Sequence, residues 1–135
     1  MSDSGKARRI VVDIDPMGKP RMTRSDRWTN KEKGVGRPAV LRYFNWQDEL
    51  LLRMPDYEVP AEFKITFYMP FPKSYSKKKR ESLLGKPHKE KPDIDNLQKA
   101  FLDTLCEEDS YVWHVDASKV WSDKGQIVII ESEGK

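Results

Sequence analysis

Apolar residues recur along this chain at two spacings, and these spacings predict seven elements of secondary structure. Alternating or β-branched apolar residues predict strands at 10–14, 62–70, 111–123 and 126–133. Stripes at helical spacing predict helices at about 39–54 and 95–106. A short helix is expected from Ser76, as its N-cap, to a stop at Gly85, with Leu83 and Leu84 docking its end.

The order of these elements predicts an α+β fold, with helices packed on a mixed β-sheet. The last two strands are separated by a short stretch around Lys124 and Gly125, so we expect them to form a hairpin. Residues at about 15–38 are rich in glycine, proline and charge and predict a basic irregular segment. With 135 residues and no internal repeat or linker, residues 1–135 are expected to form a single domain.

The composition narrows the class of protein. Apolar residues make up 37% of the chain and charged residues 35%, which is typical of a folded, soluble protein with a heavily ionised surface. No apolar run approaches the roughly 18 residues that cross a bilayer, and the start lacks the apolar segment of a secretory signal, so we expect a cytoplasmic protein without membrane partners. Cys106 is the single cysteine, which excludes an internal disulfide and a thiolate zinc site. Oxygen atoms are therefore the expected ligands of any metal.

The net charge is only +3, but basic residues crowd two stretches, at 18–27 and 72–91. Locally basic surfaces bind phosphate backbones and release counterions, so nucleic acid is the first partner to consider. Each run by itself is explained about as well by solvated loops. The side chains expected to contact DNA are Lys73, Lys77, Lys78, Lys79, Arg80, Lys86, Lys89 and Lys91, with Arg21 and Arg24 as weaker candidates.

The stretch "KPDIDNLQK" at 91–99 concentrates candidate chemistry. Pro92 disfavours helical dihedrals in the residue before it, and an extended backbone at 93–95 would direct Asp93 and Asp95 to the same side. Within the helix that follows, Asp95, Lys99 and Asp103 recur at i, i+4 and i+8 and therefore share one polar edge.

A helix cap is the competing explanation for this stretch. Asp95 is a good N-cap residue, and Gln98 stands three positions later, where a capping box places Glu or Gln. The two explanations are compatible, because a carboxylate has two oxygens, and one can cap while the other faces a metal.

Paired carboxylates with a nearby lysine suit phosphodiester cleavage. Oxygen ligands hold Mg²⁺ or Mn²⁺, which polarises a phosphoryl oxygen and lowers the pKa of bound water. Asp116 is a third candidate ligand if its strand lies beside the start of the helix. Lys99 is expected to stabilise the phosphate in the transition state.

The blocks "KPDIDNLQKAFLDTL" and "VWHVDASKV" resemble the core signature of the RusA family of Holliday junction resolvases. The first block matches at every fixed position. The second departs from the family, which usually has a pair of aspartates where this chain has Val115 and Asp116. The resemblance implies that Asp93, Asp95 and Asp116 bind metal and that Lys99 is catalytic. It also implies that Asp103 contacts the metal ligands without binding the metal itself.

The resemblance also implies an activity: a Mg²⁺-dependent endodeoxyribonuclease, with Mn²⁺ as a possible substitute, that resolves four-way DNA junctions by paired symmetric nicks. Similar members are common in phages and act as homodimers, which fits two nicks related by a two-fold axis. No small-molecule cofactor other than the metal is expected. Two alternatives stay open: a nuclease that is less structure-specific on branched DNA, and a non-catalytic DNA-binding module whose acidic cluster serves as a cap and an ion-pair network.

Overall fold

The computed structural model describes residues 7–30, 34 and 36–132, so 31–33 and 35 of the predicted irregular segment lie outside the described residues. The elements are β1 (Ala7–Val12), the 3-10 helix η1 (Arg24–Trp28), α1 (Pro38–Arg53), β2 (Glu62–Pro70), α2 (Lys77–Leu83), α3 (Ile94–Leu105), β3 (His114–Ser122) and β4 (Gln126–Ser132). This order confirms the predicted succession and adds η1. Within the described ranges, no helix is long and apolar enough to span a membrane.

The four strands form one mixed sheet in the order β1-β4-β2-β3. β2 and β3 are parallel, and β4 is antiparallel to both β2 and β1. The predicted α+β fold with a mixed sheet is therefore confirmed, but the predicted hairpin is wrong. β2 already occupies the position beside β3, so residues 123–125 carry the chain across the end of β2 to its other side. β4 is apolar enough for this central place, with Ile127, Val128 and Ile129 all buried.

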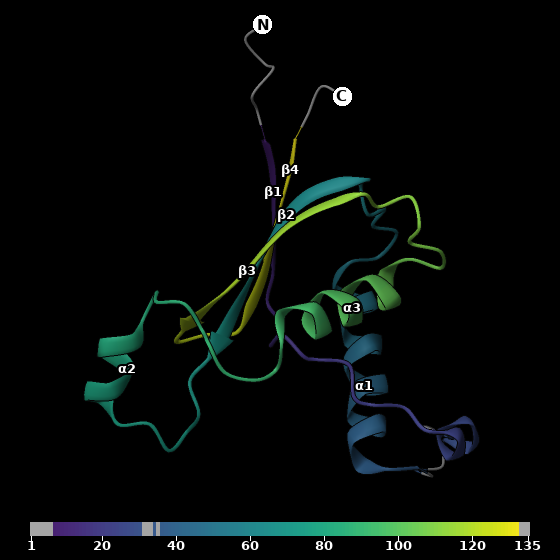
Figure 1. Cartoon of the computed structure of the whole chain (residues 1–135), viewed down its shortest axis with the longest axis horizontal. Coiled ribbons are helices and arrows are strands. Elements are labelled where there is room, and N and C mark those ends of the chain that lie inside the picture. The colour runs from purple at the N-terminus through teal and green to yellow at the C-terminus, as the bar shows by residue number, and fades with distance from the viewer. Residues whose placement is uncertain (1–6, 31–33, 35, 133–135) are drawn as a thin grey trace, which may run out of the picture.

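α1 and α3 pack on one face of the sheet (Figure 1). Alternate residues of β2, among them Ile65 and Phe67, are buried under these helices. α3 contributes the predicted stripe, with Leu97, Ala100 and Phe101 fully buried. The opposite faces of both helices stay open to solvent.

α3 begins at Ile94 rather than at Asp95, so the N-cap residue is Asp93. Asp93 has the extended dihedrals φ −66° and ψ 151°, and its side chain makes no capping hydrogen bond. The predicted cap at Asp95 is therefore wrong by two positions, and the carboxylate of Asp93 is not engaged by the helix that it precedes.

Residues 71–92 form an extension that we call the arm. α2 stands within it, apart from α1 and α3 (Figure 1), and has no buried residue. The predicted N-cap is confirmed, because the Ser76 hydroxyl accepts a hydrogen bond from the Lys79 amide at 3.1 Å. The predicted docking of Leu84 is wrong, since this side chain is 50% exposed. The arm returns to the sheet along the edge of β3, where the His88 amide donates to the Lys119 carbonyl at 3.0 Å.

Candidate active site

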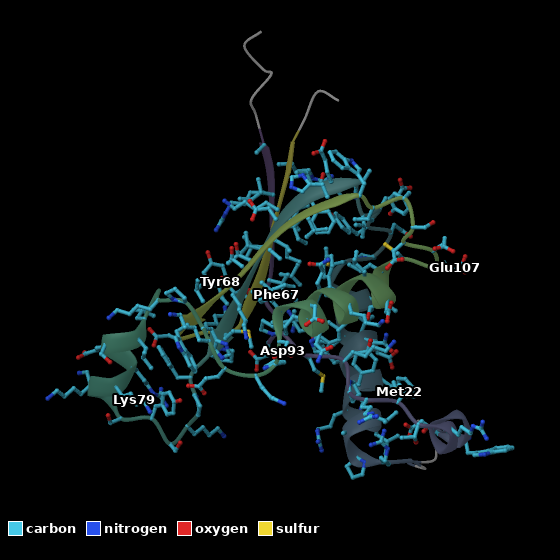
Figure 2. The ribbon with its side chains drawn as sticks, in the orientation of Figure 1. Met22, Phe67, Tyr68, Lys79, Asp93 and Glu107 are labelled. Atoms are coloured by element: carbon cyan, nitrogen blue, oxygen red, sulfur yellow. The ribbon has the colours of Figure 1, made fainter. Side chains whose placement is uncertain are left out.

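Asp93 and Asp95 both stand at the start of α3, but the extended backbone predicted at 93–95 is present only at Asp93, because the helix already begins at Ile94. Asp93 and Asp95 are both exposed, one as the N-cap and the other in the first turn. Figure 2 shows Asp93 where the arm passes into α3. The positive end of the helix dipole favours negative charge at this point.

The predicted polar edge of α3 is present, since Asp95, Lys99 and Asp103 are all exposed on one side of the helix. Asp103 accepts a hydrogen bond from the Lys19 ammonium at 2.7 Å, which ties the helix to a segment 84 positions earlier. Lys99 forms no ion pair with any residue in the described part of the chain. Its ammonium is therefore available to a ligand.

Residues 17–22 run beside the first half of α3 and form a groove with it. The Lys19 amide donates to the Asn96 carbonyl at 3.4 Å. Gly18 permits this approach, because a Cβ atom at that position would lie 2.8 Å from the Cβ of Pro92. Two adjoining cavities result. One of about 370 Å³ is lined by Gly18, Lys19, Lys91, Pro92, Asp93 and Asn96, and one of about 400 Å³ by Lys19, Pro20, Arg21, Met22, Asn96 and Lys99. We call both together the α3 groove.

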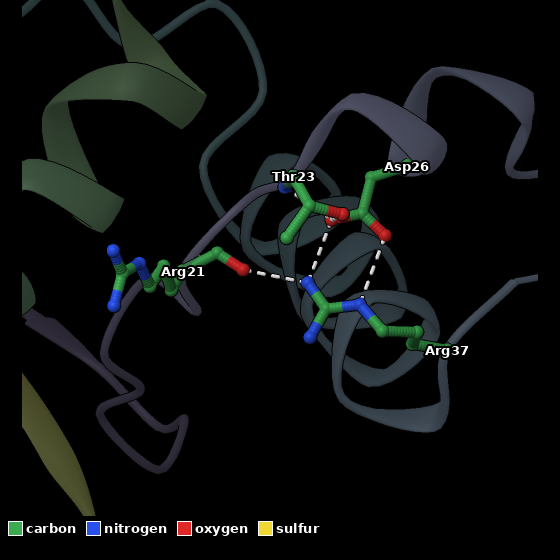
Figure 3. A network of polar contacts seen from close by, with 4 residues as sticks. All are labelled: Arg21, Thr23, Asp26 and Arg37. Atoms are coloured by element: carbon green, nitrogen blue, oxygen red, sulfur yellow. Dashed lines mark hydrogen bonds and ion pairs between the residues drawn. The ribbon is translucent and has the colours of Figure 1, made fainter.

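An ion pair between the half-exposed Arg37 and the buried Asp26 holds the segment beyond the groove. The Arg37 guanidinium donates to both carboxylate oxygens of Asp26, at 3.0 and 2.6 Å, and to the Arg21 carbonyl at 2.6 Å (Figure 3). The Arg37 hydrogen bonds, followed by that from the Thr23 amide, keep the pKa of Asp26 far below its usual range. Figure 3 shows the Arg21 guanidinium pointing away from this pair, so the network holds the Arg21 backbone, while Arg21 also lines the α3 groove.

Asp116 does not join Asp93 and Asp95. In the parallel pairing of β2 with β3, Asp116 stands opposite Lys64, which is exposed, and not opposite the buried Phe63 or Ile65. Paired residues point to the same face of a sheet, so Asp116 lies on the face that α3 does not cover. No group of three or more possible metal-ligating acidic, histidine or cysteine side chains forms among the described residues. The expected convergence of three aspartates is therefore absent, and the parity of β3 is the reason.

The helix-facing side of β3 instead carries Val115, Ala117, Lys119 and Trp121. The Lys119 ammonium donates to the Pro92 carbonyl at 2.6 Å and to the Glu90 carbonyl. Sequence reasoning missed this residue. The sequence did contain a signal for it, because Lys119 occupies an alternate position of the strand that is otherwise filled by apolar residues.

The basic residues of the arm are accessible, with Lys73, Lys77, Lys78, Lys79, Lys86, Lys89 and Lys91 all exposed. Figure 2 shows Lys79 on α2, far from Asp93, and its ammonium lies 3.9 Å from the centre of the Tyr75 ring. Arg80 is partly used within the arm, since its guanidinium donates to the Tyr75 carbonyl at 3.1 Å. Arg24 is exposed on η1. Contact of these residues with DNA stays a prediction.

The arm is a cationic extension next to a groove lined by the carboxylate of Asp93, an arrangement suited to bringing a phosphate backbone to the start of α3. The sequence profile described as Endodeoxyribonuclease RusA matches residues 13–131 of the 135. The chain belongs to the RusA endodeoxyribonuclease family. The match includes β2, the arm, the α3 groove and β3, so all the candidate residues lie inside the RusA region. RusA membership assigns endonucleolytic cleavage of DNA to this fold. A search of curated proteins found no match to the chain.

Proposed function

We propose that this chain is a Mg²⁺- or Mn²⁺-dependent endonuclease that resolves four-way DNA junctions by paired, symmetric nicks. The observation that carries the proposal is Asp93, whose carboxylate makes no capping hydrogen bond and lines the α3 groove together with the cations Lys19, Lys91 and Lys99. The family match supports the cleavage of DNA, and the groove supports the location of the chemistry.

The residues at the start of α3 suit a hard divalent cation. Asp93 and Asp95 offer exposed carboxylate oxygens, and Asp93 makes no hydrogen bond to cap the helix. Mg²⁺ is commonly held by one or two carboxylates together with substrate phosphates and water, so Asp93 and Asp95 suffice as ligands. Such an ion supplies Lewis-acid polarisation of a phosphoryl oxygen and an acidified water. The role of Asp116 as a further ligand stays a prediction, because it lies on the other face of the sheet.

The basic residues of the groove have distinct tasks in this proposal. Lys99, without an ion-pair partner among the described residues, binds the phosphate that is cut and stabilises the charge that develops on it. Arg21 and Lys91 line the flanking cavities and hold neighbouring phosphates. Asp103 binds the ammonium of Lys19 and so keeps the groove wall against α3.

A homodimer follows from the substrate in this proposal. Resolution of a four-way junction takes two nicks related by a two-fold axis, and one chain carries one α3 groove. Two chains related by the same axis would present two sites at once. The arm of each chain, with its exposed lysines, would follow the DNA leading into its groove.

One observation favours a second candidate function. The three expected carboxylates do not form one group among the described residues, because Asp116 lies on the other face of the sheet, and this is compatible with a DNA-binding module that does not cut. A nuclease that is less specific for structure would use the same groove on branched DNA of other shapes.

A cleavage assay separates these functions. The protein is incubated with a synthetic four-way junction or with linear duplex, in Mg²⁺, Mn²⁺ or EDTA, beside Asp93→Asn, Asp95→Asn and the matched control Asp109→Asn, an exposed aspartate outside the groove. We expect nicking of the junction with either metal, and a loss of at least about 100-fold in both Asp93→Asn and Asp95→Asn but not in the control.

Each other outcome has a defined meaning. Tight junction binding without nicking in any metal would establish the non-catalytic module. Equal cutting of linear duplex would establish the less specific nuclease. Asp116→Asn distinguishes the ligand sets: a loss as large as that of Asp93→Asn would mean that β3 rearranges to bring Asp116 to the metal.

A further inference from the structure

Lys119 lies on the side of β3 that faces the helices. It pairs in register with Phe67, which is buried, and it alternates with Val115, Ala117 and Trp121. A long cationic side chain in such a row must direct its ammonium to a polar partner, because an unpaired charge against an apolar face is costly.

The partners of Lys119 are backbone carbonyls of the segment that leads into α3. Its ammonium donates to the Pro92 carbonyl at 2.6 Å and to the Glu90 carbonyl. Neither acceptor carries a full negative charge, and Lys119 forms no ion pair with any other described residue. The positive charge is therefore held in place without being neutralised.

These contacts fix the position of Asp93. The Pro92 carbonyl belongs to the peptide bond that continues into Asp93, and the Asp93 carbonyl accepts the Leu97 amide at 3.1 Å, the first helical hydrogen bond of α3. Pro92 is also packed against Gly18 on the groove side. The segment that leads into α3 is thus held on two sides. Lys119 binds it from the sheet, and Gly18 in the groove wall packs against it from the other side.

We infer that Lys119 is a positioning residue for cleavage: its ammonium, bound to the Pro92 and Glu90 carbonyls, orients Asp93 toward the α3 groove. The inference rests on the proposed function. In this inference β3 contributes to the site through Lys119, which is on the helix-facing side of the sheet. Asp116, on the opposite side, is not required for that contribution.

The test compares substitutions of lysine on the two faces of the sheet. Lys119→Met removes the ammonium and keeps the apolar stem, whereas Lys119→Arg keeps donors for both carbonyls. Lys64→Met is the matched control, because Lys64 is an exposed lysine on the uncovered face of the neighbouring strand. For each variant, kcat and KM are measured on a four-way junction in Mg²⁺, and junction binding is measured separately in EDTA.

The expected result is a fall of about 10- to 100-fold in kcat for Lys119→Met, the usual cost of losing a residue that orients a catalytic group. Junction binding in EDTA should change by less than about 3-fold, Lys119→Arg should recover most of the activity, and Lys64→Met should resemble the parent. The double variant with Asp93→Asn should be no slower than Asp93→Asn by itself, because residues that act as a unit are not additive. Additive losses, or an unchanged kcat in Lys119→Met, would overturn the inference.

Hydrogen exchange keeps this test separate from that of the proposed function. In Lys119→Met, the Leu97 amide should exchange about 10-fold faster because its acceptor, the Asp93 carbonyl, is no longer fixed. The His88 amide should be unchanged, since its acceptor is the main-chain carbonyl of residue 119, which the substitution keeps. If the parent protein never cuts DNA, the proposed function fails, whereas equal exchange of Leu97 in parent and variant refutes the positioning of Asp93.

Discussion

Trp121 anchors the arm, and its replacement by alanine should release the arm while the sheet and helices remain folded. Its side chain is 4% exposed and stacks on Phe71, with ring centroids 5.4 Å apart and ring planes at 10°. The rings of His88 and Tyr75 lie 4.3 and 5.7 Å from it. This aromatic group stands outside the main core cluster, which contains neither Trp121 nor Phe71.

The magnitude follows from the burial of the indole. A tryptophan side chain buries about 150–250 Å², which at about 25 cal/mol per Å² gives roughly 4–6 kcal/mol. Measured Trp→Ala losses are about 3–5 kcal/mol. The main-chain hydrogen bonds between Trp121 and the arm, such as that from its amide to the Lys86 carbonyl at 2.9 Å, survive the substitution. We therefore expect the free energy of opening the arm to fall by about 3 kcal/mol, which corresponds to roughly 100-fold faster exchange.

Hydrogen exchange by mass spectrometry measures this directly, with junction affinity at several salt concentrations as a second readout. Peptides from the arm should exchange faster in Trp121→Ala, while those from α1 and β4 should not. Junction binding should weaken and its dependence on salt should become shallower, because phosphate contacts of the arm are lost. Trp113→Ala, at a tryptophan that is 72% exposed, is the control and should behave like the parent. Equal acceleration in the arm and in the core would refute the reasoning.

Two further predictions concern pH. Burial, and then the charge of Lys119, lower the pKa of His88 below 6.5, so the folded state resists its protonation. The free energy of unfolding should therefore decline as the pH falls below 6.5, and His88→Phe, which keeps the aromatic contact, should reduce this decline in denaturant titrations at a series of pH values. Arg37 keeps the pKa of Asp26 below 3.8, so the pair contributes stability that is full above this pH and lost in acid. Arg37→Met should lower the free energy of unfolding at neutral pH and flatten its fall in acid; an unchanged acid profile would show that the ion pair contributes no stability.

The elements of this fold were largely predictable because their signals are local. The alternation of Phe63, Ile65 and Phe67 marks β2, and the stripe of Leu97 and Phe101 marks α3. The pairing of the strands was not predictable in the same way, because it depends on contacts across the sheet. A short connection between the last two strands favoured a hairpin, yet β4 lies beyond β2 because the parallel crossover through the arm and α3 had already placed β3 at the edge.

The candidate site also has a part that a local motif predicts and a part that depends on the pairing of strands. The carboxylates at the start of α3 and Lys99 one turn later follow from one short motif, and all three side chains are exposed in the structure. The contribution of β3 depends on strand parity, where a shift of one residue reverses every side chain. Val115, Ala117 and Trp121 are apolar residues at alternate positions of that strand, and their spacing already directs Asp116 to the other face. Asp116 was predicted to be a ligand because it is a carboxylate, but the apolar residues beside it in β3 determine to which face of the sheet its side chain points.

Besides the ion pair of Lys19 with Asp103, two contacts at the start of α3 use main-chain acceptors, which has a consequence for how the chemistry of the groove can vary. The Lys19 amide donates to the Asn96 carbonyl, and the Lys119 ammonium donates to the Pro92 carbonyl. Both acceptors are carbonyls, so neither contact requires a particular side chain at the start of α3. Substitutions such as Asp93→Asn can therefore abolish a ligand while the groove keeps its form. For this reason, loss of cutting in that variant with unchanged junction binding would report on chemistry and not on folding.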